Sequence, residues 1–402
     1  MTKPIPKYFE FQNPTKILAG EDALLSLLDE LRRLQMKKPL IITDKGIIKF
    51  GLFRKVKQAI GADELTSLVF DDVPPDGSLE VVKQAVEIYR KNHCDSFIAI
   101  GGGSVIDTAK GVNIVISEGT DDLNSLMGHD RLTNPQQPLV VIPTTSGTGS
   151  EVTLVSVIAD TARQQKMLFT SSLLQPSLTV IDPEMTLSLP PLLTAATAMD
   201  ALTHAIEAYT CLQKNPFSDS FAQLAIELIA ENILVAVNNG SNKEARYRLA
   251  IASTAAGIAF SNSMVGAVHG IGHTVGALAH FHHGNTMAIL LPHVMNYNLD
   301  KTVHLYALIY RMIEPDCQSK LLTDDQKAKA VIKWIVEVNQ HLNLACNMPD
   351  SLEKAGVHLD QLQEIAQLSL NDGAMIANPK EIDAKDALEI LNNAFINKLE
   401  YV

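Results

Sequence analysis

The sequence lacks any excess of positive charge. Its 33 lysines and arginines are outnumbered by 45 aspartates and glutamates, which gives a formal net charge of −12. Proteins that bind nucleic acids normally carry a basic surface, so this composition argues against a nucleic-acid partner. The same acidity disfavours attachment to anionic lipid surfaces. We therefore expect a soluble protein whose partners are small molecules.

Cysteine and long apolar runs are also scarce. The four cysteines lie far apart and form no Cys-x-x-Cys pair: Cys94, Cys211, Cys317 and Cys346. A chain of this size does not need disulfides for stability, so we expect reduced thiols. The N-terminal segment lacks the apolar core of a signal peptide. No segment approaches the run of about 18 apolar residues that a membrane span needs. These absences predict a cytoplasmic protein with no membrane anchor.

Apolar residues, by contrast, are plentiful, at 46% of 402 residues against 19% charged. This length suits about two domains. Within residues 1–185, short apolar segments alternate with helical patterns such as Leu79–Asn92 and Val105–Val115. The apolar segments read as buried strands at residues 38–43, 96–100, 138–142 and 177–181. This alternation predicts a Rossmann-like, doubly wound parallel sheet.

The pattern of apolar residues changes after residue 185, where strand patterns are replaced by helical spacing of Ala, Leu and Ile. We expect Ser218 or Asp219 to cap a long helix that ends near Val237, and Lys327–Leu342 to form another helix. The predicted fold class is therefore α/β plus all-α. An N-terminal α/β domain (residues 1–185) is followed by a helical domain (residues 186–402).

Two glycine-rich loops follow predicted strands. The first loop, Gly101–Ser104, opens a helix whose N-terminal amides favour an anion. The second, Pro143–Ser150, adds hydroxyl groups suited to ribose or phosphate, from Thr144, Thr145 and Thr148. Neither loop matches the G-x-G-x-x-G fingerprint, so simple turns remain an equal alternative to a nucleotide site.

Asp44 ends the first clear strand, in the segment IITDKG. A carboxylate at that position accepts the ribose hydroxyls of a dinucleotide and repels a 2′-phosphate, which favours NAD over NADP. The residue is equally suited to capping the helix that follows.

The second half contains a group of possible metal ligands. Asp200 and His204 are four residues apart in a helical segment, so both side chains leave the same face. Five of the twelve histidines then fall within fifteen residues: His269, His273, His280, His282 and His283. In one unbroken helix His269 and His283 would lie about 21 Å apart, so sharing an ion requires a bend or two helices. The residues alone leave open which histidines bind.

The ligand types limit the metal. One carboxylate with imidazoles and no thiolate suits Fe(II), Zn(II), Mn(II) or Co(II). Structural zinc sites are usually dominated by cysteine, so a catalytic role is favoured. Next to a nicotinamide ring, such an ion would lower the pKa of an alcohol and promote hydride transfer.

Together these motifs resemble the iron-containing (group III) alcohol dehydrogenases. The resemblance rests on four segments, which are GGGSVIDTAK, PTTSGTGSE, Val180–Glu207 and VHGIGHTVGALAHFHHG. It implies an α/β dinucleotide-binding domain followed by a helical metal and substrate domain. It also implies a metal, Fe(II) or alternatively Zn(II), held by Asp200, His204, His269 and His283.

The resemblance further implies NAD as the cofactor and at least a homodimer. It places Gly102, Gly103, Ser104, Thr144, Thr145, Thr148 and Lys166 around NAD, and the position of Asp44 and Gly101 at strand ends adds these two. His273 matches a histidine that relays a proton without binding metal. The chain departs from many members at His282, where they have proline, and at Asp76, where they have asparagine.

The predicted reaction is reversible, NAD-dependent oxidation of a primary alcohol or diol to an aldehyde, at a site in the cleft between the two domains. A second hypothesis is a zinc- and NAD-dependent enzyme of the glycerol dehydrogenase or dehydroquinate synthase type. A third is a metal hydrolase whose glycine loops are only turns.

Overall fold

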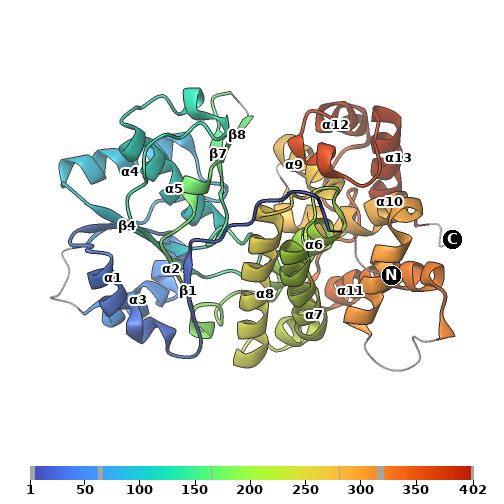
Figure 1. Cartoon of the computed structure of the whole chain (residues 1–402), viewed down its shortest axis with the longest axis horizontal. Helices are drawn as coiled ribbons and strands as arrows, with labels where there is room; N and C mark the ends of the chain where they lie inside the picture. Colours follow the sequence, from blue (N-terminus) through green and yellow to red (C-terminus); the bar gives the residue numbers. More distant parts are fainter. Residues whose placement is uncertain (1–4, 62–66, 164, 280, 315–320, 400–402) are drawn as a thin grey trace. The chain divides into compact units, whose positions relative to one another are not determined.

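The structure is a computed structural model, and it describes residues 5–61, 67–163, 165–279, 281–314 and 321–399. His280 and Cys317 lie outside the described residues. The chain divides into two compact units, one of residues 13–189 and one of residues 190–402 together with residues 1–12. Figure 1 labels the helices of both units and several strands of the first unit.

The first unit is built on a six-stranded, fully parallel sheet in the order β1-β9-β6-β4-β2-β3. Its strands are β1 (Lys16–Ala19), β2 (Pro39–Ile42), β3 (Leu68–Phe70), β4 (Ser96–Gly101), β6 (Leu139–Pro143) and β9 (Leu178–Ile181). The four predicted strands are β2, β4, β6 and β9, which are the four central ones. All their residues are buried, as expected for parallel strands covered on both faces.

Helices cover both faces of this sheet (Figure 1). Along β4, Phe97 and Ala99 pack into one apolar cluster, while Ile98 and Ile100 pack into another. The first cluster lies under α4 (Leu79–Lys91) and α5 (Gly103–Glu118). The second lies under α1 (Leu27–Arg33), α2 (Lys45–Lys49) and α3 (Leu52–Ile60). The α/β prediction is confirmed.

A smaller sheet in this unit was not predicted. It consists of β5 (Gly128–His129), β7 (Val155–Asp160) and β8 (Gln165–Thr170), with β7 and β8 antiparallel. Short 3-10 turns complete the unit: η1 (Ala23–Ser26), η2 (Leu123–Leu126), η3 (Ser172–Leu174) and η4 (Pro183–Met185).

The described part of residues 190–402 contains helices and no strands, so the helical prediction is also confirmed. The helices are α6 (Pro191–Thr210), α7 (Pro216–Asn238), α8 (Lys243–Ser261), α9 (Ala267–Ala279), α10 (His283–Ile313), α11 (Asp324–Cys346), α12 (Leu362–Ser369) and α13 (Ala384–Phe395), with 3-10 turns η6 (Leu359–Gln361) and η7 (Gly373–Ala377). Residues 201–210 of α6 are all buried, which makes α6 the central helix of this core.

The start of α7 differs from the prediction. The capping residue is Asn215, whose side chain accepts the amides of Phe217 and Ser218, so neither Ser218 nor Asp219 is the cap. Ser218, at the third helical position, instead accepts the backbone amide of Asn215 on its Oγ, which completes a capping box, and Pro216 occupies the first position. The helix therefore begins at Pro216, earlier than predicted, and proline is tolerated there because the first amides of a helix have no partner within it.

α7 is also long and apolar enough, by length and composition, to cross a membrane, with a mean hydropathy of 1.6 in its most apolar window. Polar residues interrupt the segment, which is why it contains no long apolar run. Its residues Ala222, Ile226, Ile229 and Ile233 are fully buried in the helical core. In the most apolar window 44% of the residues are buried, and one such helix is only weak evidence of a membrane span.

Candidate active site

The candidate metal centre begins on α6. Asp200 and His204 are one turn apart and both buried, at 3% and 6% exposure, and Asp200 Oδ1 lies 3.9 Å from His204 Nδ1. The ring of His204 stacks on Phe260 of α8, with centroids 4.3 Å apart. Packing therefore holds both side chains on the face of α6 that the sequence spacing predicts.

The remaining histidines come from two different helices. α9 ends at Ala279 and α10 begins at His283, so His269 and His283 do not share one helix. Their Nε2 atoms lie 3.7 and 3.4 Å from Asp200 Oδ1. Gly284 makes this approach possible, because a Cβ there would lie 2.2 Å from the carbonyl oxygen of Ala196 on α6.

The donor atoms have the spacing that a single ion needs. Those of Asp200, His269 and His283 all lie within 4.8 Å of one another. His204 is not in this group of three, although its ring stacks on His269 at 4.3 Å. Ligands about 2.1 Å from a tetrahedral ion lie about 3.4 Å apart, close to the observed distances from Asp200.

Several of these atoms have no hydrogen-bond partner. Within the described part of the chain, Asp200 Oδ1, His204 Nδ1 and His269 Nε2 are buried and unpaired. Each unpaired buried polar atom costs about 1–3 kcal/mol. Three such atoms around one point fit a divalent ion, which would accept all three lone pairs.

Charge in the cluster also suits a cation. Burial raises the pKa of Asp200, but its histidine neighbours, His204 and His283 foremost, outweigh burial and hold that pKa well below its usual value. Burial lowers the pKa of His204 to about 3 and also lowers that of His283, with Asp200 opposing in both cases. At neutral pH the cluster therefore offers a carboxylate and two neutral rings.

Glu207, which the sequence reasoning missed, supports His269. Its Oε2 lies 2.6 Å from His269 Nδ1, and its Oε1 accepts the amide of Val268 at 2.7 Å. Burial lowers the pKa of His269, but the nearby carboxylates of Asp200 and Glu207 outweigh burial and raise it to about 9. A carboxylate behind a ligating imidazole fixes the ring and makes it more basic. The spacing of seven residues from Asp200, on the same helical face, was the signal available in the sequence.

His273 lies beside the cluster. Its ring stacks on that of His283, with the ring centroids 5.5 Å apart. Its Nδ1 lies 2.8 Å from Asp372 Oδ2. His282 is exposed and caps the start of α10, where its carbonyl accepts the amides of Asn285 and Thr286. These positions separate the two histidines from the group of three close donors.

In the α/β unit the two glycine loops lie against each other at the carboxyl ends of neighbouring strands β4 and β6. A Cβ on Gly102 would lie 3.0 Å from Thr145, and one on Gly103 would lie 2.7 Å from Thr148. The amide of Thr144 donates to Gly101. The loops thus form one surface at the N-terminus of α5, and glycine is required where they touch.

Three charged groups border these elements. Asp44 Oδ1 accepts the amide of Ile47 and caps α2, so the capping role considered for it is real. Lys166 on β8 lies 3.7 Å from Asp76 Oδ1. The amide of Asp76 donates to Ser104 Oγ at the first turn of α5. Lys166 and Asp76 are therefore close to the first glycine loop.

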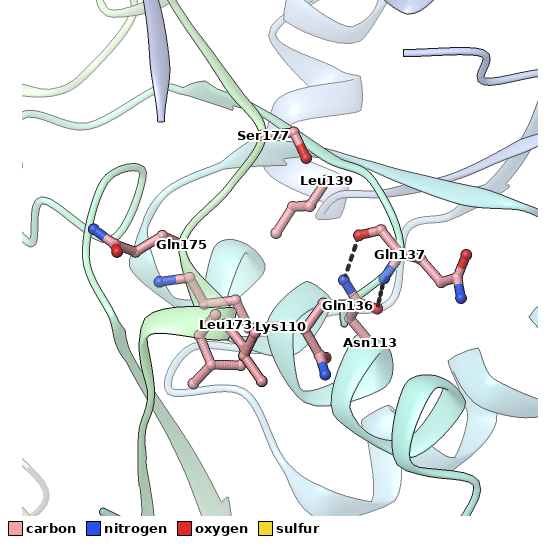
Figure 2. Close-up of a pocket in the computed structure, with 9 residues that line it drawn as sticks. Lys110, Asn113, Gln136, Gln137, Leu139, Leu173, Gln175 and Ser177 are labelled. Atoms are coloured by element: carbon pink, nitrogen blue, oxygen red, sulfur yellow. Dashed lines mark hydrogen bonds between the residues drawn. The ribbon is translucent and has the colours of Figure 1, made fainter. Parts of the chain in front are cut away.

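Figure 2 shows a small cavity elsewhere in this unit, of about 60 Å³. Lys110 from the first glycine motif lines it, but the Lys110 Nζ is bound by the carbonyls of Thr153 and Val155. Asn113 and Gln137 exchange two hydrogen bonds at its edge. Burial lowers the pKa of Lys110 to about 8. The cavity has room for a few waters, and Lys110 ties α5 to β7.

This chain combines a parallel sheet that carries paired glycine loops with helices that bring together a carboxylate and imidazoles. The combination is typical of dehydrogenases that use a metal and a nucleotide cofactor. Comparison with known proteins narrows this class. The profile of the iron-containing alcohol dehydrogenases matches residues 14–183, and that of the family's C-terminal domain matches residues 194–395. The chain belongs to the iron-containing alcohol dehydrogenase family.

Individual relatives agree with this assignment. The 1,3-propanediol dehydrogenase of Citrobacter freundii is 36% identical, over 97% of this chain and 99% of that protein. The NAD-dependent methanol dehydrogenase of Bacillus methanolicus is 34% identical, over 95% and 98%. A crystal structure of 1,3-propanediol oxidoreductase superimposes with a TM-score of 0.92 at 34% identity, over 97% and 100%. The chain is thus an enzyme, an NAD-dependent alcohol dehydrogenase. The comparisons give no support to the hypothesis of a glycerol dehydrogenase or dehydroquinate synthase, nor to that of a metal hydrolase.

Proposed function

We propose that Asp200, His204, His269 and His283 together hold one divalent metal, with Fe(II) as the natural ion and Zn(II) as a competent substitute. The observation that carries this proposal is the set of three buried, unpaired donor atoms on Asp200, His204 and His269. Oxygen and nitrogen donors without thiolate suit both ions, so availability decides between them.

When bound, the ion supplies a Lewis acid that lowers the pKa of the alcohol hydroxyl. The protein's own residues set up this chemistry. Asp200 contributes the negative charge, and Glu207 orients the ring of His269. His273 accepts the proton that the alcohol loses. Its Nδ1 lies 2.8 Å from Asp372 Oδ2, which leaves Nε2 for this task.

NAD binds the surface formed by the two glycine loops. The amides at the N-terminus of α5 receive the pyrophosphate, because a helix N-terminus favours an anion. Asp44 keeps one carboxylate oxygen for the ribose hydroxyls while the other caps α2. The proposed contacts are Asp44, Gly101, Gly102, Gly103, Ser104, Thr144, Thr145, Thr148 and Lys166.

The substrate that we propose is a primary alcohol or a short diol, which is oxidised reversibly to the aldehyde. The relatives named for propanediol and methanol support this range of sizes. We also propose that the enzyme works in the cytoplasm as a homodimer or larger homo-oligomer. Size measurement of the purified protein by light scattering tests the oligomeric state.

Metal analysis after anaerobic purification, followed by a panel of alcohols with NAD and NADP, tests the function. Asp200→Ala and His269→Ala should lose both metal and turnover, yet still bind NADH in a fluorescence titration. His341→Ala is the matched control, because this exposed ring on α11 lies far along the chain from the proposed ligands and its Nδ1 contacts the carbonyl of Glu337. Normal alcohol oxidation by a metal-free variant would refute the proposal.

A further inference from the structure

The carboxylate of Asp372 is half-buried, and each of its two oxygens lies within hydrogen-bond distance of a nitrogen. Oδ2 lies 2.8 Å from His273 Nδ1, and Oδ1 accepts the amide of Ala374 at 2.8 Å, where Asp372 caps η7. Its side chain is 24% exposed and that of His273 is 40% exposed. The carboxylate therefore has a fixed direction toward one nitrogen of the ring.

The fold fixes this contact across 99 residues of sequence. Two further contacts hold the segment 372–378 on α9. Met375 packs on Gly270, where a Cβ would lie 2.5 Å from the Met375 sulfur. Asn378 accepts the amide of Ala267 at the first residue of α9 and also pairs with Asn298 of α10. The segment is thus anchored beside the helix that carries His269 and His273.

The hydrogen bond determines which nitrogen of His273 carries hydrogen. An ionised carboxylate only accepts hydrogen bonds, so His273 Nδ1 must be the protonated nitrogen of the neutral ring. Burial raises the pKa of Asp372, but its contacts with His273 outweigh burial and lower that pKa below the usual value, so the carboxyl is ionised at neutral pH. Nε2 then keeps its lone pair and is the nitrogen left to take up a proton.

We propose that Asp372 is the positioning residue for His273, because its contact with Nδ1 directs proton uptake to Nε2. This inference rests on the proposed function of His273. The alcohol loses its O–H proton to Nε2 and its C–H hydride to NAD, and the C=O bond forms. The imidazolium then passes its proton to water, and the carboxylate of Asp372 stabilises the positive ring while it exists.

Asp372→Asn separates positioning from capping. Asparagine retains an oxygen for the amide of Ala374, but its NH₂ group donates to Nδ1, which reverses the tautomer of the ring. Asp383→Asn is the matched control, because Asp383 caps α13 by accepting the amides of Lys385 and Asp386. A purely structural role would give both variants the same behaviour.

We expect Asp372→Asn to lower kcat by roughly 10- to 100-fold, within the range for general acid–base catalysis. Metal content, the NADH dissociation constant and the melting temperature should stay within the range of the Asp383→Asn control. In a His273→Ala background, Asp372→Asn should have no further effect on kcat. Nitrogen-15 NMR of histidine-labelled protein, both metal-free and zinc-loaded, should show Nδ1–H at His273 in the wild type and Nε2–H in Asp372→Asn.

The outcomes distinguish this inference from the proposed function. If His273→Ala loses kcat but Asp372→Asn does not, the positioning role is overturned and the role of His273 stands. If His273→Ala keeps its full kcat, both are overturned. An unchanged tautomer in Asp372→Asn, or an equal loss of kcat in the presence and absence of the His273 ring, would likewise overturn the inference.

Discussion

At the scale of single residues, Glu207 tests how a carboxylate behind a proposed metal ligand affects metal affinity. Glu207→Gln keeps the shape of the side chain but removes the charge that faces His269 Nδ1 at 2.6 Å. We expect metal affinity to fall by about 10- to 100-fold, as is usual when such a carboxylate is lost. Competition with a chelator measures the affinity, with Glu231→Gln on the exposed face of α7 as the control. Unchanged affinity would show that Glu207 only supports the backbone at Val268.

His293 on α10 provides a pH prediction outside the cluster. Burial lowers its pKa to about 4 from 6.5, so the unfolded chain binds a proton more readily than the folded protein does. Stability is therefore lost as pH falls from about 6.5 toward 4, and the loss is complete below pH 4. Between pH 7 and 5 this amounts to roughly 2 kcal/mol.

The comparison with His293→Gln isolates this contribution. Urea unfolding at pH 7 and pH 5 should show that the wild type loses roughly 2 kcal/mol more than the variant does. Both proteins need to be in the same metal state. An identical loss in the two proteins would mean that His293 is not neutral in the folded enzyme.

Asp76 bears on nucleotide affinity. Its side chain is 71% exposed and lies 3.7 Å from Lys166 Nζ. If Lys166 binds NAD as proposed, Asp76→Asn removes a charge that would compete with the NAD phosphates for this lysine. Exposed ion pairs contribute about 0.2–1 kcal/mol, so we expect NADH to bind up to about five times more tightly. A fluorescence titration measures the affinity for NADH. Asp121→Asn is the control, because Asp121 also forms an exposed ion pair, with Arg90. Weaker binding would show that Asp76 itself contacts the nucleotide.

The sequence predicted these residues unevenly, for a physical reason. Asp200 and His204 were placed correctly on one helical face because four residues is a local distance. The partners of His273 and Lys166 were not predictable, because Asp372 and Asp76 are distant in sequence and their contacts arise only from tertiary packing. The resemblance, and no local pattern, selected His283 among the five clustered histidines.

At the scale of helices and strands, the start of α10 is the most sensitive junction. Gly284→Ala would put a methyl group 2.2 Å from the carbonyl oxygen of Ala196, so α10 must move away from α6. We expect a loss of about 1–3 kcal/mol in stability, as for overpacked cores, together with weaker metal binding because His283 moves too.

Gly276→Ala in α9 is the matched control. A Cβ there meets only a backbone oxygen at 3.9 Å, so the change should be neutral or stabilise by up to about 1 kcal/mol. Thermal unfolding and a chelator titration follow both variants. If Gly284→Ala behaves like Gly276→Ala, the close contact between α6 and α10 does not position His283.

The same scale explains which strands were predicted. The central strands β2, β4, β6 and β9 are buried on both faces and carry continuous apolar runs. The edge strands β1 and β3 are only partly buried, and β7 alternates buried with half-buried residues. Their weaker apolar patterns give no clear strand signal. Pairing with a neighbouring strand, more than local sequence, determines that these segments form strands.

At the scale of the whole molecule, each unit has its own apolar core. The α/β unit packs two clusters on the faces of its sheet, and the helical unit packs a separate cluster around α6. The proposed metal ligands all belong to the helical unit, and the proposed NAD contacts all belong to the α/β unit. Bound metal should therefore stabilise mainly the helical unit, and bound NAD should stabilise mainly the α/β unit.

Hydrogen exchange measured by mass spectrometry tests this division. Adding Zn(II) to metal-free protein should slow exchange in α6, α9 and the first turns of α10, while NADH should slow it at Gly101–Ser104 and Thr144–Thr148. A ligand at 1,000 times its dissociation constant stabilises the folded state by about 4 kcal/mol, which is enough for a clear change in exchange. Asp200→Ala should abolish the response to Zn(II) and preserve the response to NADH. Protection of the glycine loops by Zn(II) with α6 unaffected would place the metal outside the helical unit.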